Sequence, residues 1–339
     1  MKAIGYQSSH PITHPEALLD IELPKPVATC RDILVKIEAI SVNPVDSKIR
    51  SSATPAENEF KVLGWDAVGT VDSVGEQVTL FKPGDKVWYA GAVNRAGCNA
   101  QFHLVDERIV SLAPTTLSAI QAAALPLTSI TAWELLFDRF NLSTESTGTL
   151  LIIGAAGGVG SVMIQLAKKL TKLTVIATAS RAETKHWVKS LGADHIIDHH
   201  KHLWDELKSV GVEHVNYVAS LTHTEQHLPS IVEIIAPQGK LGVIDSPTTL
   251  DIMPFKPKSV SVHWEFMFTR SMFTTDDILQ QHEILSRVAK LVDDGKLKST
   301  IANKTADSNC AVINAHNLIK AHTLLESDKS IGKIVLSGF

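Results

Sequence analysis

A glycine-rich segment in the middle of the chain has the chemistry of phosphate binding. It follows the apolar run 150–153 and precedes a helical pattern that starts at Ser161. Because glycine has no Cβ, a diphosphate can approach the turn closely and the helix can pack tightly on the strand. The helix N-terminus also offers unpaired N–H groups and a partial positive charge. The predicted diphosphate contacts are Gly154, Ala155, Gly157, Gly158, Val159 and Gly160. A turn that only packs is the alternative.

The residues about 20 positions beyond this loop bear on which dinucleotide binds, because NAD-preferring sites place an Asp or Glu there. Here the sequence reads Ala179-Ser180-Arg181, without a carboxylate to repel a 2′-phosphate. Ser180 can donate a hydrogen bond to that phosphate, and Arg181 and Lys185 can pair with its charge. The pattern favours NADP(H). Ser180 and Glu183 also form a capping-box pattern, and both interpretations can hold together.

Five residues directly after two later strands of the expected sheet are candidate cofactor contacts. They are Ser220, Leu221 and Thr222 after the fourth strand, and Ile244 and Asp245 after the fifth. Rossmann sheets bind ligands at the carboxyl ends of their strands, so we expect these residues to line the cofactor site. The run 222–225 is also a capping box, in which case Thr222 would serve only the following helix.

Short apolar runs alternate with amphipathic helical patterns from residue 149 onward, as in a parallel sheet. The expected strands are 149–154, 173–178, 194–197, 213–218, 239–244 and 259–264, and the expected helices are 158–170, 181–191, 203–209 and 224–236. Six strands make a full dinucleotide-binding sheet. We therefore predict an α/β fold with a doubly wound, six-stranded Rossmann sheet.

The part of the chain before residue 115 has short β-like runs separated by Pro and Gly turns. Examples are the runs 33–37, 67–71 and 86–90 and the turn 82–85. We predict a mostly antiparallel, barrel-like unit with few helices. Helical patterns follow at 118–124, 131–140 and 275–292, and a closing strand at 331–336 is expected to return to the N-terminal unit.

Composition excludes several classes of function. The length of 339 residues suggests two domains. The net charge is −4, and the Lys and Arg residues form no basic stripe that could bind nucleic acid. No apolar stretch is expected to approach the length of a membrane span, and the N-terminus has no long apolar segment, so we expect a cytoplasmic protein. The three cysteines, Cys30, Cys98 and Cys310, are too few and too scattered for a disulfide framework or a zinc cluster.

Several segments together resemble the medium-chain dehydrogenase/reductase superfamily, in particular its quinone oxidoreductase branch and the zinc-type alcohol dehydrogenase-like group. They are 41–46, 63–69, 81–85, 125–133, 154–160, 191–194 and 332–336. The resemblance implies a GroES-like substrate domain formed by residues 1–124 and 267–339, and a Rossmann domain formed by residues 125–266. It also implies a homodimer joined through the sixth Rossmann strand; an edge covered by the following loop is the alternative.

The resemblance bears on metal binding as well. Zinc-dependent members hold the catalytic metal with Cys, His and Cys. By motif comparison these positions are Asn43, Trp65 and Leu127 here, and Cys98 is alone where a structural-zinc lobe would lie. We therefore expect no metal.

Fifteen histidines invite a different metal hypothesis, especially the sets 199–202 and 223–227. Solvated surface histidines are the favoured interpretation, because neither set is completed by a carboxylate or a cysteine.

The resemblance also places Asn43 and Thr128 beside the nicotinamide and the substrate, where they could orient the ring or bind an oxyanion. The alternatives are a turn residue and a helix cap. Asp46 is a weaker catalytic candidate, because it could stabilise Arg50 or cap a local helix. Tyr89 is a possible proton donor, although packing is the usual role of such an aromatic. The stretch 263–268 favours interface or core packing over a substrate pocket.

Without a metal Lewis acid, acceptors that delocalise the developing charge are favoured. We therefore predict a zinc-independent, NADPH-dependent reductase of quinones or other conjugated carbonyl compounds. The alternatives are reduction of another activated alkene, such as an enoyl thioester or a haloacrylate, and a non-catalytic NADPH-binding, crystallin-like protein.

Overall fold

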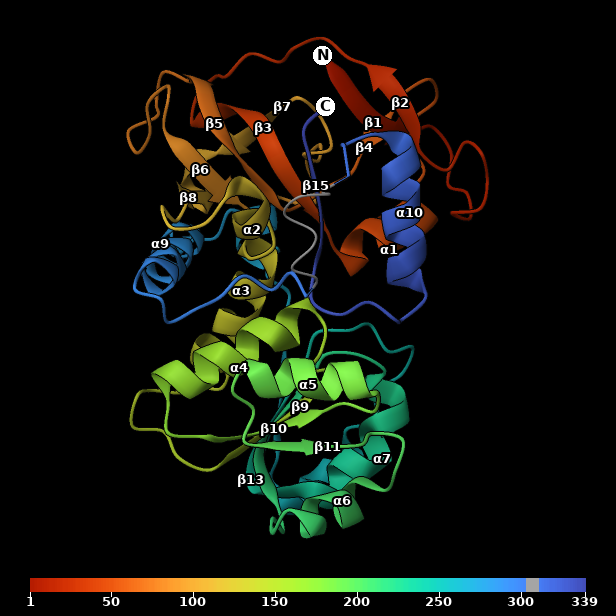
Figure 1. The fold of residues 1–339 in the computed structure, drawn as a ribbon, viewed down its shortest axis with the longest axis vertical. Coiled ribbons are helices and arrows are strands. Elements are labelled where there is room, and N and C mark those ends of the chain that lie inside the picture. Colours follow the sequence, from red (N-terminus) through yellow and green to blue (C-terminus); the bar gives the residue numbers. More distant parts are fainter. Residues whose placement is uncertain (303–310) are drawn as a thin grey trace. The chain divides into compact units, whose positions relative to one another are not determined.

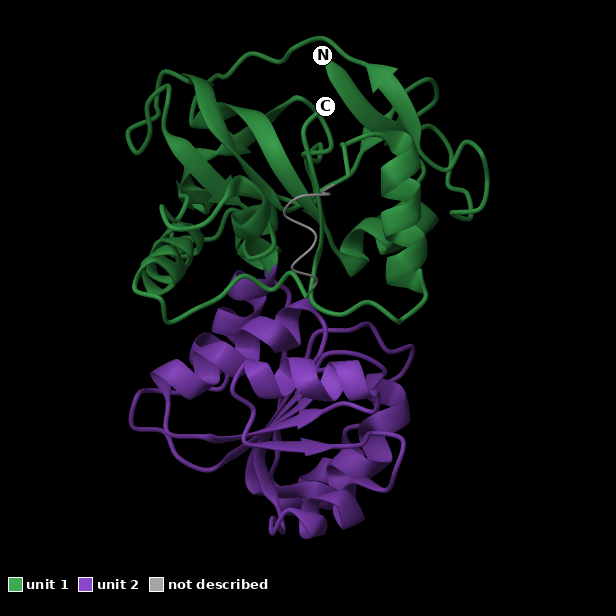
Figure 2. Ribbon diagram, in the orientation of Figure 1, with its two compact units in different colours: residues 1–127, 268–339 green, residues 128–267 purple. Residues whose placement is uncertain are grey.

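A computed structural model describes residues 1–302 and 311–339, which form two compact units (Figures 1 and 2). One unit comprises Met1–Leu127 and Phe268–Phe339, and the other comprises Thr128–Met267. Both chain ends therefore belong to the same unit. Cys30 is exposed and Cys98 is buried, both as free thiols, whereas Cys310 lies outside the described residues.

The second unit contains a six-stranded parallel sheet in the order β11-β10-β9-β12-β13-β14. Its elements are β9 (Thr149–Ile153), α4 (Gly158–Leu170), β10 (Thr174–Thr178), α5 (Ala182–Ser190), β11 (His195–Ile197), α6 (Leu203–Ser209), β12 (Val215–Ser220), α7 (Thr224–Ile234), β13 (Ile235–Val243), the 3-10 helix η3 (Met253–Lys258) and β14 (Ser261–Trp264). The order reverses between β9 and β12, the point at which such sheets bind ligands. The predicted Rossmann sheet is confirmed.

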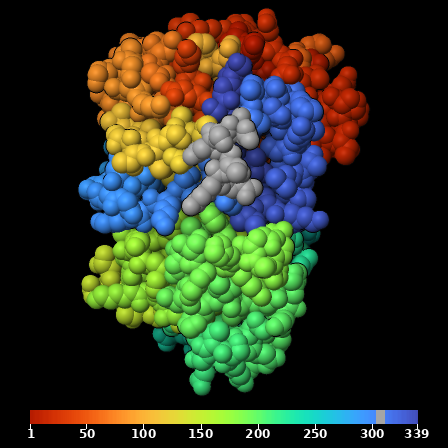
Figure 3. Space-filling model, viewed as in Figure 1, coloured from red at the N-terminus to blue at the C-terminus, as the bar shows by residue number. Residues whose placement is uncertain are grey.

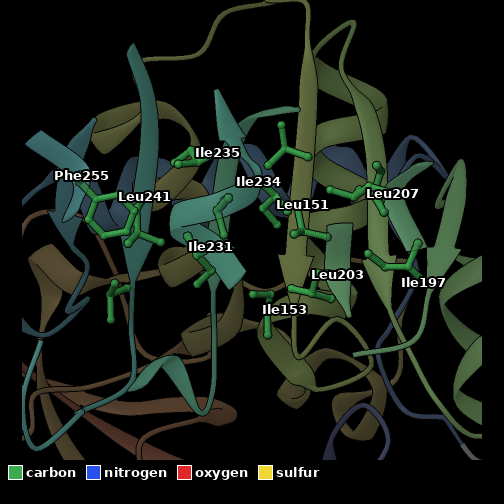
Figure 4. Close-up of a cluster of buried hydrophobic side chains, with 14 residues drawn as sticks. Leu151, Ile153, Ile197, Leu203, Leu207, Ile231, Ile234, Ile235, Leu241 and Phe255 are labelled. Atoms are coloured by element: carbon green, nitrogen blue, oxygen red, sulfur yellow. The ribbon is translucent and has the colours of Figure 1, made fainter. Parts of the chain in front are cut away.

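Burial of the strands on both faces holds this sheet in place. Leu151 and Ile153 of β9 are at most 1% exposed and pack in a cluster with apolar residues of α6, α7 and η3. Figure 4 shows Leu203 of α6 and Ile231 of α7 pointing into this cluster. Continuous apolar runs are typical of parallel strands that helices cover on both sides. The packing fixes where the carboxyl end of each strand stands, and the candidate site lies at those ends.

The first unit is built on antiparallel sheets. Its strands are β1 (Lys2–Tyr6), β2 (Leu19–Glu22), β3 (Asp32–Val42), β4 (Lys61–Val62), β5 (Ala67–Val74), β6 (Lys86–Tyr89), β7 (Phe102–Asp106), β8 (Val110–Leu112) and β15 (Ile334–Ser337). They form the sheet β2-β1-β4 and the sheet β15-β3-β5-β6-β8, with β7 also paired to β3. The predicted antiparallel, GroES-like unit is confirmed.

The two ends of the chain meet within this unit. Strand β15 pairs antiparallel with β3, with Leu336 opposite Ile40. Figure 3 accordingly shows blue C-terminal residues against red N-terminal residues on the surface in view. The predicted return of the last strand to the N-terminal unit is confirmed.

Helices connect these sheets. They are α1 (Pro44–Ser52), the 3-10 helix η1 (Glu107–Ile109), α2 (Ala119–Ala123), α3 (Pro126–Trp133), the π-helical segment η2 (Glu134–Arg139), α8 (Thr269–Phe273), α9 (Gln280–Asp293) and α10 (Ala315–Glu326). Helix α1 lies where few helices were expected, and Pro44 at its first position is the local signal for it. The helix expected at 275–292 is present as α9 but begins later, at Gln280, because residues 276–279 form turns.

The expectation that no apolar stretch approaches the length of a membrane span was wrong. The helical stretch Ala119–Arg139, which comprises α2, α3 and η2, is long and apolar enough to cross a membrane, whereas no such stretch was anticipated. However, 78% of its most apolar window is buried inside the protein. Its composition is therefore that of a core helix, in which apolar side chains pack against the protein rather than against lipid.

Candidate active site

The glycine-rich loop leaves β9 through a turn that only glycine fits. Gly154 has a φ of +79°, and a Cβ there would lie 2.9 Å from Thr222 Cγ2. Its N–H donates to Thr178 Oγ1 at 3.1 Å, which ties the loop to the end of β10. The positive φ and the close contact together require glycine at position 154.

The start of α4 is packed on one side and open on the other. A Cβ on Gly160 would lie 2.5 Å from Ala155 Cα, so this glycine lets the helix pack against the loop. A Cβ on Gly157 would meet only Gly154 O, at 3.5 Å. Ser161 N donates to Gly157 O, and it is the first amide of α4 that has a carbonyl acceptor one turn earlier. The N–H groups before it point out of the helix end, which suits an anion.

The residues after β12 lie beside this loop. Leu221 N donates to Ile153 O at 3.2 Å, and Thr222 lies next to Gly154. The structure therefore brings together Gly154, Leu221 and Thr222. The capping alternative for Thr222 is wrong, because His223 is the N-cap of α7, and Thr222 Oγ1 contacts His223 Nδ1 at 2.7 Å.

A carboxylate two residues after β13 caps α7 instead. Asp245 accepts hydrogen bonds from Thr224 N at 2.9 Å and from Thr224 Oγ1 at 2.5 Å, and Ser220 Oγ lies 2.7 Å from the same hydroxyl. Ile244 N donates to Ser220 O at 3.3 Å. Ser220, Ile244 and Asp245 thus meet at one edge of the sheet, but the Asp245 carboxylate is engaged in holding the helix. Their contacts with a cofactor stay a prediction.

The residues after β10 offer basic groups at the surface. The N-cap of α5 is Arg181 and no side chain caps this helix, so the capping-box alternative for Ser180 is wrong. Arg181 Nε lies 3.3 Å from Glu183 Oε1. Lys185 is exposed one turn further along α5. A phosphate bound by Arg181 would therefore compete with Glu183 for the guanidinium.

A second set of predicted residues lies in the first unit, where β3 passes into α1. Asn43 N donates to Asp46 Oδ2 at 2.7 Å, and Asp46 N donates back to Asn43 O. Both residues are only 1% exposed. Asp46 therefore caps α1, which was one of its two alternative roles, whereas Arg50 pairs with Glu326 of α10.

A buried ion pair holds the Asn43 side chain. Lys333, directly before β15, lies 3.0 Å from Asp66 Oδ2 and also donates to Asn43 Oδ1 and to Val42 O. Asn43 Nδ2 donates to Asp66 Oδ2 at 2.8 Å. The other oxygen of Asp66 accepts from Leu127 N at 2.8 Å. The Nδ2 and Oδ1 atoms of Asn43 thus both form hydrogen bonds within the protein, and these bonds fix the orientation of the side chain.

Burial dominates the electrostatics of this cluster. It raises the pKa of Asp46 to about 7, although the Asn43 N–H and the Lys333 ammonium oppose the shift. Burial also raises the pKa of Asp66 and lowers that of Lys333, while their attraction for each other opposes both shifts. An acid with a pKa near 7 can exchange protons at neutral pH, so the proposed catalytic role of Asp46 has a physical basis.

Two other candidates have contacts that bear on their roles. Thr128 is the third residue of α3 and is 2% exposed, so it does not cap that helix. Tyr89 is buried, and its hydroxyl lies 2.9 Å from His103 Nδ1, while His103 Nε2 contacts Ala96 O. Burial raises the pKa of Tyr89 well above 10. Tyr89 is therefore a packed residue rather than an accessible proton donor.

Sequence reasoning missed Asp66 and Lys333. Both lie inside segments that carried the resemblance, but neither received a role. The available signal was an ionisable residue in an otherwise apolar motif, since charged side chains are rarely buried unless they are paired. Their pairing across more than 260 positions of sequence could not be read from either motif alone.

Comparisons with known proteins agree with this architecture. The family model described as alcohol dehydrogenase GroES-like domain matches residues 30–115, and the model described as zinc-binding dehydrogenase matches residues 191–336. A zinc-type alcohol dehydrogenase-like protein of Staphylococcus epidermidis is 38% identical over 342 residues, covering 99% of both chains. The chain belongs to the zinc-type alcohol dehydrogenase-like group of the medium-chain dehydrogenase/reductase superfamily.

Solved structures of this superfamily have the same fold. A putative zinc-dependent alcohol dehydrogenase protein from Rhizobium etli is 53% identical with a TM-score of 0.94, covering 100% of this chain and 98% of that one. The Escherichia coli quinone oxidoreductase complexed with NADPH is 25% identical with a TM-score of 0.83, covering 99% and 100%. The chain is therefore a medium-chain oxidoreductase that resembles quinone oxidoreductases, and a nicotinamide cofactor fits its glycine loop.

The zinc in the name of the group has no matching ligands among the three residues that motif comparison assigns to the catalytic metal. Asn43, Trp65 and Leu127 offer neither thiolate nor imidazole, the ligands that zinc prefers there. Asn43 Oδ1 already accepts from the Lys333 ammonium, a cation within the same cluster. In the described part of the chain, His10, His14 and Glu16 are the one group of His, Cys, Asp or Glu with metal-ligand spacing. The sets 199–202 and 223–227 form none, although His199 and His227 are half-buried rather than fully solvated.

We expect Lys333→Met to destabilise the protein by about 3–5 kcal/mol, because it leaves the Asp66 carboxylate buried without its cation. Urea-induced unfolding measures this change. The double variant Lys333→Met/Asp66→Asn should recover much of the loss. As a control, Lys86→Met removes an exposed partner of Glu38 and should cost less than about 1 kcal/mol. A double variant no more stable than Lys333→Met would contradict the pairing.

A pH dependence follows from the raised pKa of Asp46. The folded protein binds the carboxyl proton of Asp46 more tightly than the unfolded chain does. This proton therefore stabilises the folded state fully below about pH 4, and the stabilisation is lost as the pH rises to about 7. Asp46→Asn keeps a hydrogen-bond acceptor but cannot ionise. Relative to this variant, the wild type should lose on the order of 4 kcal/mol between pH 4 and pH 8. Denaturant unfolding across this range measures the difference. A constant difference would contradict the raised pKa.

Proposed function

We propose that this protein is an NADPH-dependent reductase that transfers hydride to quinones or other conjugated carbonyl compounds without a catalytic metal. The observation that carries the proposal is the open N-terminus of α4 at the glycine-rich loop, with Gly154 and Gly160 required by their close contacts. Such a site suits the diphosphate of a dinucleotide. A bound nicotinamide supplies the hydride, and the residues of the chain bind and orient the reactants.

Metal independence is supported by the cluster around Lys333. A positive ammonium held by Asn43 Oδ1 and Asp66 occupies the hydrogen-bonding capacity of these residues and disfavours a second cation. A simple ketone would then lack a Lewis acid for its alkoxide. Quinones and enones give phenolates or enolates, whose delocalised charge needs only hydrogen-bond donors. The substrate class therefore follows from the missing zinc ligands.

The choice of NADPH is supported by the residues after β10. Ser180, Arg181 and Lys185 stand where a carboxylate would select NADH, and Lys185 is exposed. Arg181 is held by Glu183 at 3.3 Å, so its guanidinium is positioned near the surface before any phosphate arrives. A charge-assisted hydrogen bond to a 2′-phosphate would replace the exposed Arg181–Glu183 ion pair. Such an exposed pair contributes little to the stability of the folded protein, so its loss costs little.

The catalytic roles divide in this proposal. Thr128 is a donor for the nicotinamide or the substrate oxygen. Asp46, with its pKa of about 7, holds or releases a proton. Asn43 acts as a positioning residue, because Asp66 and Lys333 already hold both ends of its amide. A cytoplasmic location belongs to the same proposal, since the free thiols Cys30 and Cys98 suit a reducing compartment.

Steady-state oxidation of NADPH tests the proposed function. With benzoquinone or an enone, the purified protein should oxidise NADPH faster than NADH, and a chelator should leave the rate unchanged. A primary alcohol with NADP⁺ should give no turnover. Chelator-sensitive alcohol oxidation would contradict the metal-free proposal. Tight binding of NADPH without turnover on any acceptor would favour the non-catalytic alternative, and activity confined to enoyl thioesters or haloacrylates would favour the other activated alkenes.

Matched variants test the cofactor preference in the same assay. Arg181→Ala/Lys185→Ala should reduce the NADPH-to-NADH ratio of kcat/KM by about tenfold or more, since charge-assisted hydrogen bonds are lost. Lys189→Ala lies on the same helix, but its ammonium contacts Ala193 O and Asp194 O. This control should leave the ratio unchanged. An unaltered ratio in the double variant would contradict the phosphate role.

We also propose a homodimer through β14, because this strand is an edge of the Rossmann sheet. Trp264 is 55% exposed and Phe266 is 47% exposed beside that edge, as expected of residues that a second copy covers. Sedimentation should give twice the chain mass, and Trp264→Glu should give monomers. Phe273→Glu, at a 72% exposed residue of the other unit, is the control and should remain dimeric. A monomeric wild type would favour the covered-edge alternative.

A further inference from the structure

The connection between β1 and β2 carries two histidines and a glutamate that the proposed reaction does not use. The ligand atoms of His10, His14 and Glu16 all lie within 4.8 Å of one another. Both imidazoles are half-buried and Glu16 is exposed, so solvent and ions reach the group from one side. Two imidazoles and one carboxylate form a recurrent ligand set for zinc and related ions.

The backbone of this connection is ordered by its own turns. Each histidine is followed by a proline, Pro11 and Pro15, which restricts the backbone at that point. His14 N donates to Pro11 O at 2.9 Å, and Ala17 N donates to His14 O at 3.1 Å. These successive turns place the two imidazoles on the same side of the loop, with ring centroids 3.9 Å apart. Little backbone entropy would be lost when an ion binds.

Contacts to α1 and α10 hold the loop in the first unit. The Arg50 guanidinium donates to His10 O and pairs with Glu326, while Ser9 Oγ donates to Arg50 O at 2.9 Å. Arg50 itself is only 2% exposed. Its positive charge is balanced by Glu326, so it does not face the loop as an unpaired cation.

We propose that His10, His14 and Glu16 bind one divalent ion of the zinc class, with water completing the coordination. The ion would link the two turns of the loop through both histidines. Glu16 would supply a negative charge, and the two neutral imidazoles would supply nitrogen ligands. The proposal does not depend on the proposed catalytic function, because none of these residues has a role in it.

Binding requires a small rearrangement that the structure defines. The rings are stacked at 14° to each other, so they must turn for a nitrogen of each to point at one ion. His14 Nδ1 accepts from Glu16 N at 3.2 Å, which places the ring proton on Nε2. Coordination through either nitrogen replaces this hydrogen bond with a metal–nitrogen bond. Only side-chain torsions at the surface need to change.

Titration of the full-length, untagged protein tests the site. After treatment with chelator and buffer exchange, calorimetry with Zn²⁺ should give one ion per chain, and Co²⁺ should give visible absorption bands typical of nitrogen ligation. His10→Ala/His14→Ala should abolish both signals. Glu16→Gln should weaken Zn²⁺ binding by about tenfold or more, because loss of a direct ligand should cost at least as much affinity as loss of a residue that only hydrogen-bonds to a ligand. Removing the affinity tag is essential, because its histidines would compete.

A second histidine pair provides the matched control. His199 and His227 are half-buried in the other unit, with ring centroids 6.1 Å apart. His199→Ala/His227→Ala removes the same number of imidazoles and should leave the stoichiometric Zn²⁺ site intact. Unchanged binding by His10→Ala/His14→Ala, or loss of binding in the control, would overturn the proposal. Because the quinone assay is run with chelator, its failure would count against the proposed function and not against this site.

Discussion

The buried pair of Lys333 and Asp66 is the interaction on which the first unit depends. Taking two opposite charges out of water is costly, and it is tolerated only where geometry and further hydrogen bonds satisfy both groups. Here Asn43 Oδ1, Val42 O and Leu127 N complete the bonding. The pair thereby joins four points of the chain: the end of β3, the start of β5, the start of α3 and the start of β15.

Two glycines make this convergence possible. Gly64 has a φ of +106° and Gly332 a φ of +60°, both in the left-handed region. A Cβ on Gly332 would lie 2.0 Å from Thr300 O, and one on Gly64 would lie 2.3 Å from Asn99 Oδ1. Each glycine thus allows the backbone to turn beside an ionised residue. These glycines of the motifs that first indicated the family therefore have a structural reason.

The Rossmann sheet was predictable because short apolar runs alternate with amphipathic helical patterns, and this alternation can be read without knowing which strands are neighbours. The glycine loop was predictable for a similar reason, since its spacing is local. Helix caps were less predictable. Ser180 and Thr222 each matched a capping-box pattern, yet Arg181 and His223 are the N-caps. Asp245, which follows β13, holds the start of α7. A local sequence pattern cannot show whether a residue distant in the sequence forms the hydrogen bonds to the first N–H groups of a helix.

The sequence by itself determined the fold class, the order of the Rossmann elements, the position of the glycine-rich loop and the residue types at Asn43, Trp65 and Leu127. These features depend on residue type and short spacing. Tertiary structure alone decided that Asn43 is held from both ends, that the pKa of Asp46 rises to about 7, and that His10, His14 and Glu16 share one loop face. The physical reason is that burial and charge pairing are properties of the space around a residue, and distant segments create that space.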